Sequence, residues 1–157
     1  MKKSIKSTII IIFLLITPIF LSAQNTIGQY DEKLAKELGA DEYGMKSYVL
    51  VILKTGSNKT TDKKELDSLF GGHMRNMAVL SEAGKLIVAG PLGKNGNSYR
   101  GIFILNVKDT LEARNILSTD PAVNSKVLDA DLYNWYGSAA LPLYLEPHKK
   151  IQKSTIR

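Results

Sequence analysis

Residues 66–91, LDSLFGGHMRNMAVLSEAGKLIVAGP, decide the fold of this chain. Apolar side chains recur in the first part at the spacing of one helical face: Leu66, Leu69, Phe70, Met74, Met77 and Leu80. The apolar run at 86–89 then predicts a short buried strand that ends at the Gly90-Pro91 turn. His73 lies inside the helical stripe, seven residues after Leu66. An imidazole titrates near neutral pH, so one that faces the core is a candidate functional residue.

The segments on either side complete a pattern of strands and helices. Two capping-box patterns, an Asp followed three residues later by a Glu, predict helix starts at 62 and 109, and Gly84 predicts the end of the first helix. Gly71-Gly72 predicts a weak or kinked point in that helix. The predicted elements are a strand at 48–53, a helix at 62–83, strands at 86–89 and 102–107, a helix at 109–117 and a strand at 127–136. This β-α-β-β-α-β order predicts an α+β, ferredoxin-like fold with an antiparallel sheet.

The first residues are typical of a secretory signal peptide. Three lysines precede the apolar run at 8–21, and Ser22-Ala23 supplies small residues for cleavage after Ala23. We therefore expect an exported protein, periplasmic or secreted, that is not stably inserted in a membrane after cleavage. An uncleaved anchor is the alternative. Removing residues 1–23 takes away three lysines and no acidic residue, so the net charge falls from +6 to +3.

The rest of the chain is long enough for one domain. We expect a polar lead-in at 24–46 with a short helix near 31–38, the domain itself at 47–136, and a C-terminal extension with a solvated basic tail at 137–157. The chain contains no cysteine, which excludes a disulfide scaffold and a thiol nucleophile.

The predicted strands at 48–53 and 102–107 are apolar on both of their alternating faces. Two helices cover only one face of such a sheet, so the other face would be a large exposed apolar patch in a monomer. The sequence therefore predicts a homodimer packed sheet to sheet about a two-fold axis. The alternative is that residues 139–147 fold back over the second face.

A set of these residues resembles the YCII-related family over about residues 47–136. The residues that carry the resemblance are His73, Leu80, Gly84, Leu86, the Ala89-Gly90-Pro91 turn and the later Asp120-Pro121 pair. The resemblance implies a ferredoxin-like domain that dimerises into an α/β barrel, and a His-Asp active-site pair at His73 and Asp120. It also implies proton chemistry such as the dehydrochlorination of a chlorinated hydroxyquinol. The signal peptide, the lead-in and the C-terminal extension depart from the usual small cytosolic member.

An imidazole paired with a carboxylate suits proton transfer. The ring removes and returns a proton next to a carbonyl, while the carboxylate fixes its tautomer and stabilises the imidazolium. His73 and Asp120 fit these roles if the fold brings them together. The structural alternatives are a satisfied core histidine and an aspartate that caps a short helix, with Pro121 in its first position.

Further residues are candidates for ligand binding. Gly90 and Pro91 end a strand where a ligand could approach the backbone, or they only terminate it. Ser98 and Arg100 begin the next strand, where Arg100 could hold a carboxylate or could simply be solvated. His148 is expected to be exposed in the tail.

Other ligand classes find no support in the sequence. With two histidines, no cysteine and no His-x-x-x-His pair, we expect no metal site. The positions on the predicted strand at 102–107 where an RNA-recognition motif stacks bases hold Ile102 and Ile104, so we expect no nucleic acid. The chain has no nicotinamide or flavin signature, and we expect no cofactor.

Two function classes remain open. One is a cofactor-independent lyase or isomerase that acts on a small cyclic or enol-type compound. The other is a non-catalytic module that binds a small ligand or serves as a dimeric structural domain. Because both share one fold, the fold does not choose between them.

Overall fold

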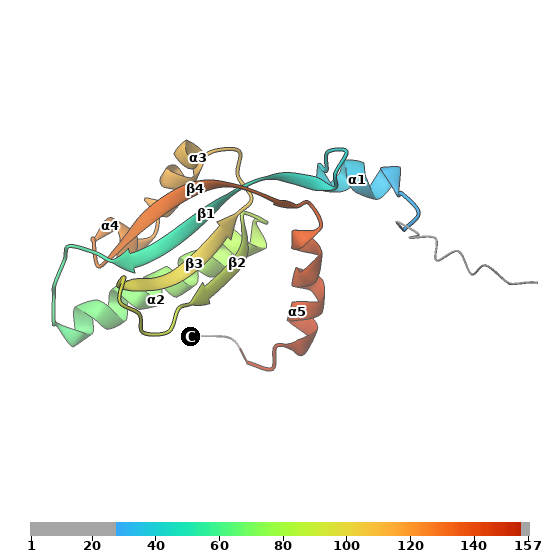
Figure 1. Cartoon of the computed structure of the whole chain (residues 1–157). Helices are drawn as coiled ribbons and strands as arrows, with labels where there is room; N and C mark the ends of the chain where they lie inside the picture. The colour runs from blue at the N-terminus through green and yellow to red at the C-terminus, as the bar shows by residue number, and fades with distance from the viewer. Residues whose placement is uncertain (1–27, 155–157) are drawn as a thin grey trace, which may run out of the picture. The chain divides into compact units, whose positions relative to one another are not determined.

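The computed structural model describes residues 28–154, and the helices and strands of these residues lie in the unit Asp31–Arg157 (Figure 1). The elements in chain order are α1 (Glu32–Leu38), β1 (Met45–Thr55), α2 (Lys63–Glu82), β2 (Leu86–Pro91), β3 (Tyr99–Leu105), α3 (Thr110–Leu117), α4 (Pro121–Asn124), β4 (Leu128–Ser138), a 3-10 turn η1 (Leu141–Tyr144) and α5 (Leu145–Ile151).

The four strands form one antiparallel sheet in the order β2-β3-β1-β4. The first strand is central and pairs with β3 on one side and with β4 on the other. With helices after β1 and β3, this is the predicted ferredoxin-like α+β arrangement, which is thereby confirmed. The sheet is open and does not close into a barrel.

The hydrophobic core lies between one face of the sheet and the helices α2, α3 and α4 (Figure 1). Alternate residues of β1, namely Val49, Val51 and Leu53, are almost fully buried there because successive side chains of a strand point to opposite faces. Their partners include Phe103 from β3 and Leu117 from α3. All three helices share this one core, so they cover the same face of the sheet.

The predicted helix starts are confirmed by their capping hydrogen bonds. The Asp62 carboxylate accepts from the backbone N–H groups of Lys64 and Glu65, and the Asp109 carboxylate accepts from that of Glu112. In a full capping box the Glu side chain would also accept from the backbone N–H of the capping Asp, but here each Glu accepts from a different residue. The Glu65 carboxylate accepts from the Thr60 hydroxyl, and Glu112 accepts from the backbone of Lys108.

α2 runs as one α-helix from Lys63 to Glu82 and continues through Gly71-Gly72, where the sequence predicted a weak or kinked point. A Cβ on Gly72 would lie 2.7 Å from Cγ of Pro121 in α4. The missing side chain therefore lets the two helices pack closely instead of bending α2.

The strand limits differ from the predicted ones. β1 and β4 pair from Met45 with Ser138 to Thr55 with Leu128, so both extend beyond the apolar runs. β3 begins at Tyr99 and ends at Leu105, three residues before the predicted start and two before the predicted end. Polar residues enter these strands because backbone pairing, and not side-chain polarity, holds them there.

The C-terminal extension contains a helix, α5, where the sequence predicted a solvated tail. His148 is exposed on it, as expected. The Tyr144 hydroxyl donates to the Ile87 carbonyl, which ties this segment to β2. The segment thus reaches the sheet, while Leu50 and Ile52 on the second face stay half-buried.

The predicted signal peptide and its cleavage after Ala23 lie outside the described residues. Of the helices in residues 28–154, none is long and apolar enough to cross a membrane.

Gly56, in the loop after β1, allows a test of how closely this loop packs against the backbone of Lys126. A Cβ on Gly56 would lie 2.0 Å from the Lys126 carbonyl oxygen, so backbone must move to admit it. We expect Gly56→Ala to lower the free energy of unfolding by about 2–3 kcal/mol. Gly93→Ala is the matched control, since a Cβ there meets open space, and we expect less than about 0.5 kcal/mol. Urea unfolding measures both, and equal losses would contradict this packing.

Candidate functional site

His73 and Asp120 meet beneath the surface of the protein. Nδ1 of His73 lies 2.6 Å from Oδ2 of Asp120, which is hydrogen-bonding distance. The histidine is 8% exposed and the aspartate 1%. They are the buried polar residues of the described chain, so this contact is the polar centre of an apolar core.

The packing of α2 against α4 brings the pair together. Gly72 presents no side chain to Pro121, so α4 can pack against α2. Asp120 is the N-cap residue of α4. One turn further along α2, the Asn76 amide donates to both the hydroxyl and the carbonyl of Thr119. The residues on each side of Asp120 are thus held to α2, and the carboxylate has little freedom to leave His73.

The two oxygens of the Asp120 carboxyl group have different partners. Oδ1 accepts from the backbone N–H of Ala122 at 2.9 Å and of Val123 at 3.4 Å, which caps α4 as the sequence predicted. Oδ2 faces His73. An ionised carboxylate can only accept hydrogen bonds, so an ionised Asp120 places the imidazole proton of a neutral His73 on Nδ1.

Two aromatic rings enclose the imidazole. Phe103 of β3 stacks on it with centroids 5.9 Å apart and planes 18° apart, and Phe70 of α2 meets it edge-on at 6.3 Å. Phe70 comes from the same helical stripe as His73, while Phe103 comes from the core face of the sheet. The ring is therefore fixed in orientation from both sides and by its hydrogen bond.

The second ring nitrogen, Nε2, is available for chemistry. Within residues 28–154 the hydrogen bond of His73 is made by Nδ1, and no buried side-chain nitrogen or oxygen lacks a partner. Nε2 is consequently in reach of solvent, although most of the ring is covered. With Nδ1 protonated, Nε2 carries a lone pair that can accept a proton from a small molecule.

The other predicted site residues, Gly90, Pro91, Ser98 and Arg100, lie on β2 and at the start of β3. Gly90 and Pro91 pair with Ile102 and Gly101 at the far end of β2, and no hydrogen bond within residues 28–154 joins either to His73. A Cβ on Gly101 would lie 2.8 Å from the Gly90 carbonyl oxygen, so the close approach in this region is between the two strands.

Ser98 and Arg100 are both exposed at the start of β3. Ser98 has a positive φ of 58°, and its carbonyl accepts from the Thr55 backbone. The Arg100 side chain makes no ion pair within the described part of the chain. Ligand binding by these two residues, and by Gly90 and Pro91, stays a prediction.

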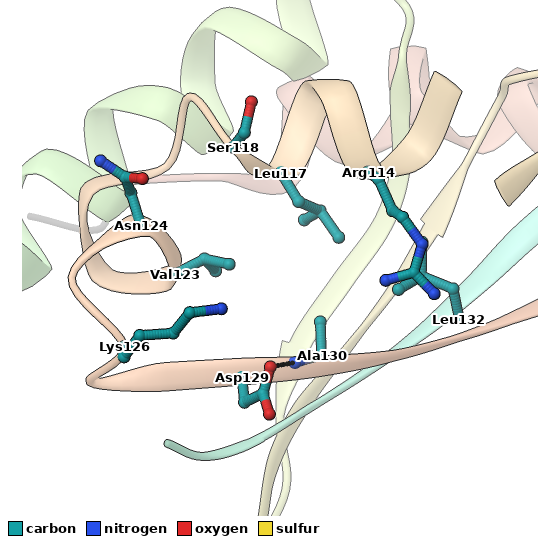
Figure 2. Close-up of a pocket in the computed structure, with 9 residues that line it drawn as sticks. All are labelled: Arg114, Leu117, Ser118, Val123, Asn124, Lys126, Asp129, Ala130 and Leu132. Atoms are coloured by element: carbon teal, nitrogen blue, oxygen red, sulfur yellow. Dashed lines mark hydrogen bonds between the residues drawn. The ribbon is translucent and has the colours of Figure 1, made fainter. Parts of the chain in front are cut away.

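Sequence reasoning missed three contributors to the site. Phe103 could have been found from the alternation of its strand, which places it on the helix side. Gly72 and Asn76 share the face of α2 that carries His73, but their roles depend on which residues lie opposite. A cavity of about 210 Å³ also escaped prediction; it lies between α3, α4 and β4 and is lined by no residue of α2 (Figure 2).

Comparisons with known proteins leave the chemistry of the chain open. No protein-family model matches it, and no curated protein sequence matches it. One similar solved structure is 5-chloro-2-hydroxyhydroquinone dehydrochlorinase from Burkholderia phenoliruptrix AC1100, in complex with 2,5-dihydroxybenzoquinone. The two chains are 14% identical, with a TM-score of 0.42, over 55% of this chain and 92% of that chain. A likeness this distant says nothing about what this protein does.

The close packing at Gly72 generates a test of how the pair is positioned. We expect Gly72→Ala to push Pro121 away, loosen the His73–Asp120 contact and lower the free energy of unfolding by about 1–3 kcal/mol. A Cβ on Gly71 would only touch the flexible Arg75 side chain at 3.4 Å. Gly71→Ala should therefore stabilise the helix by up to about 1 kcal/mol. Thermal melts compare the two variants, and opposite signs are the expected result. A neutral Gly72→Ala would contradict this packing.

Proposed function

We propose that the protein transfers protons on a small molecule, with His73 as the base and Asp120 as the residue that positions it. The observation that carries the proposal is the buried 2.6 Å contact between Nδ1 and Oδ2, which leaves Nε2 as the available nitrogen. The resemblance of residues 47–136 to the YCII-related family also supports this assignment.

In this mechanism Nε2 takes a proton from a carbon or hydroxyl next to a carbonyl group. The imidazolium that forms is stabilised by the Asp120 carboxylate on its other nitrogen. His73 then returns the proton to a second position, which isomerises the substrate, or a leaving group departs from the enolate, which makes the reaction an elimination. In this scheme His73 is the proton carrier, and Asp120 keeps its negative charge throughout.

The surroundings of the ring favour a particular kind of substrate. Phe70 and Phe103 give the imidazole apolar walls, and its exposed part is small. A small cyclic or enol-type compound with one or two polar groups suits such a place. The signal-like residues 1–23 further support action outside the cytoplasm, where the substrate would be met.

The second candidate function is ligand binding without turnover. It is favoured by the stacking of His73 on Phe103 and by its hydrogen bond to Asp120, because a ring held in one orientation can offer Nε2 to a ligand without exchanging a proton. In that case Nε2 would donate or accept one hydrogen bond with a ligand, and no proton would be exchanged.

We also propose that the protein is a dimer through the face of its sheet opposite α2, α3 and α4. Leu50 and Ile52 of β1 are paired with Ile104 and Ile102 of β3, and all four are half-buried on this face. Four adjacent aliphatic side chains on central strands form the kind of contiguous patch that marks an interface. The partner would be a second copy of this chain.

Proton transfer is tested with unsaturated five-membered lactones and cyclic ketones in D₂O. We expect the protein purified from the full-length gene to exchange carbon-bound protons or shift the double bond, followed by proton NMR. His73→Ala should slow the reaction by about 100-fold or more, the usual contribution of a general base. Asp120→Asn keeps an acceptor for the α4 cap but offers an N–H to the ring, so the tautomer changes and the rate should also fall.

His148→Ala is the matched control, since the other histidine is exposed on α5, and its rate should be unchanged. Equal rates in wild type and Asp120→Asn would contradict the role of the pair. A compound that perturbs the His73 signals but never exchanges protons would support the binding function instead.

The dimer is tested by a charge at the centre of the patch. We expect Ile52→Lys to convert a dimer into a folded monomer, because two lysines would otherwise be buried face to face without partners. Val79→Lys is the control, since Val79 is 62% exposed on α2, and this variant should remain dimeric. Sedimentation velocity at micromolar concentration measures both. A wild-type monomer would contradict the proposed interface.

A further inference from the structure

The cavity between α3, α4 and β4 is separate from the His73 site and has its own chemistry (Figure 2). Its volume of about 210 Å³ equals that of about seven water molecules at roughly 30 Å³ each. It lies along the helix-covered side of β4, which is an edge strand of the sheet. A molecule with one small ring or a short aliphatic chain matches this size.

The floor of the cavity is apolar. Leu117 of α3 belongs to the buried core, and Val123, Ala130 and Leu132 pack against that core while remaining partly exposed. These four side chains come from three different elements, so the surface is held in place by the fold. An apolar group that covered it would remove hydrocarbon surface from water.

Two cationic side chains stand over this floor. Figure 2 shows Arg114 of α3 and Lys126 of the α4–β4 turn reaching from opposite sides toward the space above Ala130. The ion pairs found in residues 28–154 include neither of them. Two cations without an ion-pair partner beside this apolar floor favour an anionic ligand.

The backbone conformation and hydrogen bonds of Lys126 fix its position. Its φ of 62° lies in the left-handed region, which residues other than glycine, asparagine and aspartate rarely adopt. Its carbonyl accepts from the backbone N–H of Asn58, and the Asn58 amide donates to the neighbouring Ser125 carbonyl. The loop after β1 thus anchors the turn from which Lys126 projects into the cavity.

The one carboxylate at the rim does not neutralise these charges. Asp129 and Ala130 are successive residues of β4, so their side chains leave the strand on opposite faces. On the second face the pKa of Lys54 is raised, mainly because its ammonium donates a hydrogen bond to Asp131. The negative charge of Asp129 raises this pKa further. The Asp129 side chain thus lies at the rim on the side of Lys54, and its Oδ1 accepts from the backbone N–H of Ala130.

We propose that this cavity binds a small monocarboxylate with an apolar body. The carboxylate would lie between the Arg114 guanidinium and the Lys126 ammonium, and the apolar body would cover Val123, Ala130 and Leu132. A guanidinium grips a carboxylate through paired N–H groups, and an ammonium adds a second positive charge. The site is distinct from the proton-transfer site, because neither His73 nor Asp120 lines the cavity.

The test is a titration of the isotope-labelled protein, purified from the full-length gene, with benzoate, benzyl alcohol and inorganic phosphate. We expect benzoate to cause saturable shifts in the amide signals of Val123, Ala130 and Leu132. Benzyl alcohol has the same ring without the charge, and phosphate has charge without the ring. Both should bind at least about tenfold more weakly, since each loses one half of the site.

Variants of Arg114 and Lys126 test whether these two cations bind the carboxylate. Arg114→Gln and Lys126→Asn should each weaken benzoate binding about tenfold; asparagine suits the left-handed backbone, so the turn is retained. Lys94→Gln, a control in the exposed β2–β3 loop, should leave binding unchanged. The proposal is overturned if benzyl alcohol or phosphate binds as tightly as benzoate. Unsaturable shifts, shifts confined to the surroundings of His73, or unchanged affinity in both variants would also overturn it.

Discussion

The carboxyl group of Asp120 is the constraint on which the site depends. One oxygen satisfies the free N–H groups at the start of α4, and the other holds His73. A buried carboxylate is costly unless its oxygens are hydrogen-bonded, and here both are. Because the same group caps a helix and orients an imidazole, the local fold and the proposed chemistry cannot be varied independently.

The short helix α4 connects the two regions to which we assign ligands. The N-terminal end of α4 faces α2. There Pro121 packs closely on Gly72, and the Asn76 amide donates a hydrogen bond to Thr119. The other side of α4, at Val123, forms part of the apolar floor between α3 and β4. The four residues of α4 therefore separate the buried His73–Asp120 pair from the positively charged cavity. The proposed ligand of the first is a proton-transfer substrate, and that of the second is a monocarboxylate.

Local signals in the sequence predicted the strand and helix order and the capping aspartates, because these depend on neighbours in the chain. The residues suggested His73 and Asp120 as a pair but could not demonstrate their contact, since the two are 47 positions apart in the sequence. The cavity was not predictable in the same way, because its two cations become neighbours only when α4 folds back. The helix α5 was missed because the basic residues of this segment favoured a solvated tail; Pro147 lies in its first turn, where proline is tolerated.

The tautomer of His73 is the most direct test of whether Asp120 positions the ring as a base. Nitrogen-15 NMR of the neutral imidazole distinguishes the two ring nitrogens by which one carries the proton. We predict that Nδ1 of His73 is protonated, through its hydrogen bond to Asp120, and that Nε2 has the signature of a free lone pair. In Asp120→Asn the proton should move to Nε2. A wild-type ring with its proton on Nε2 would contradict the assignment of His73 as a base held by Asp120.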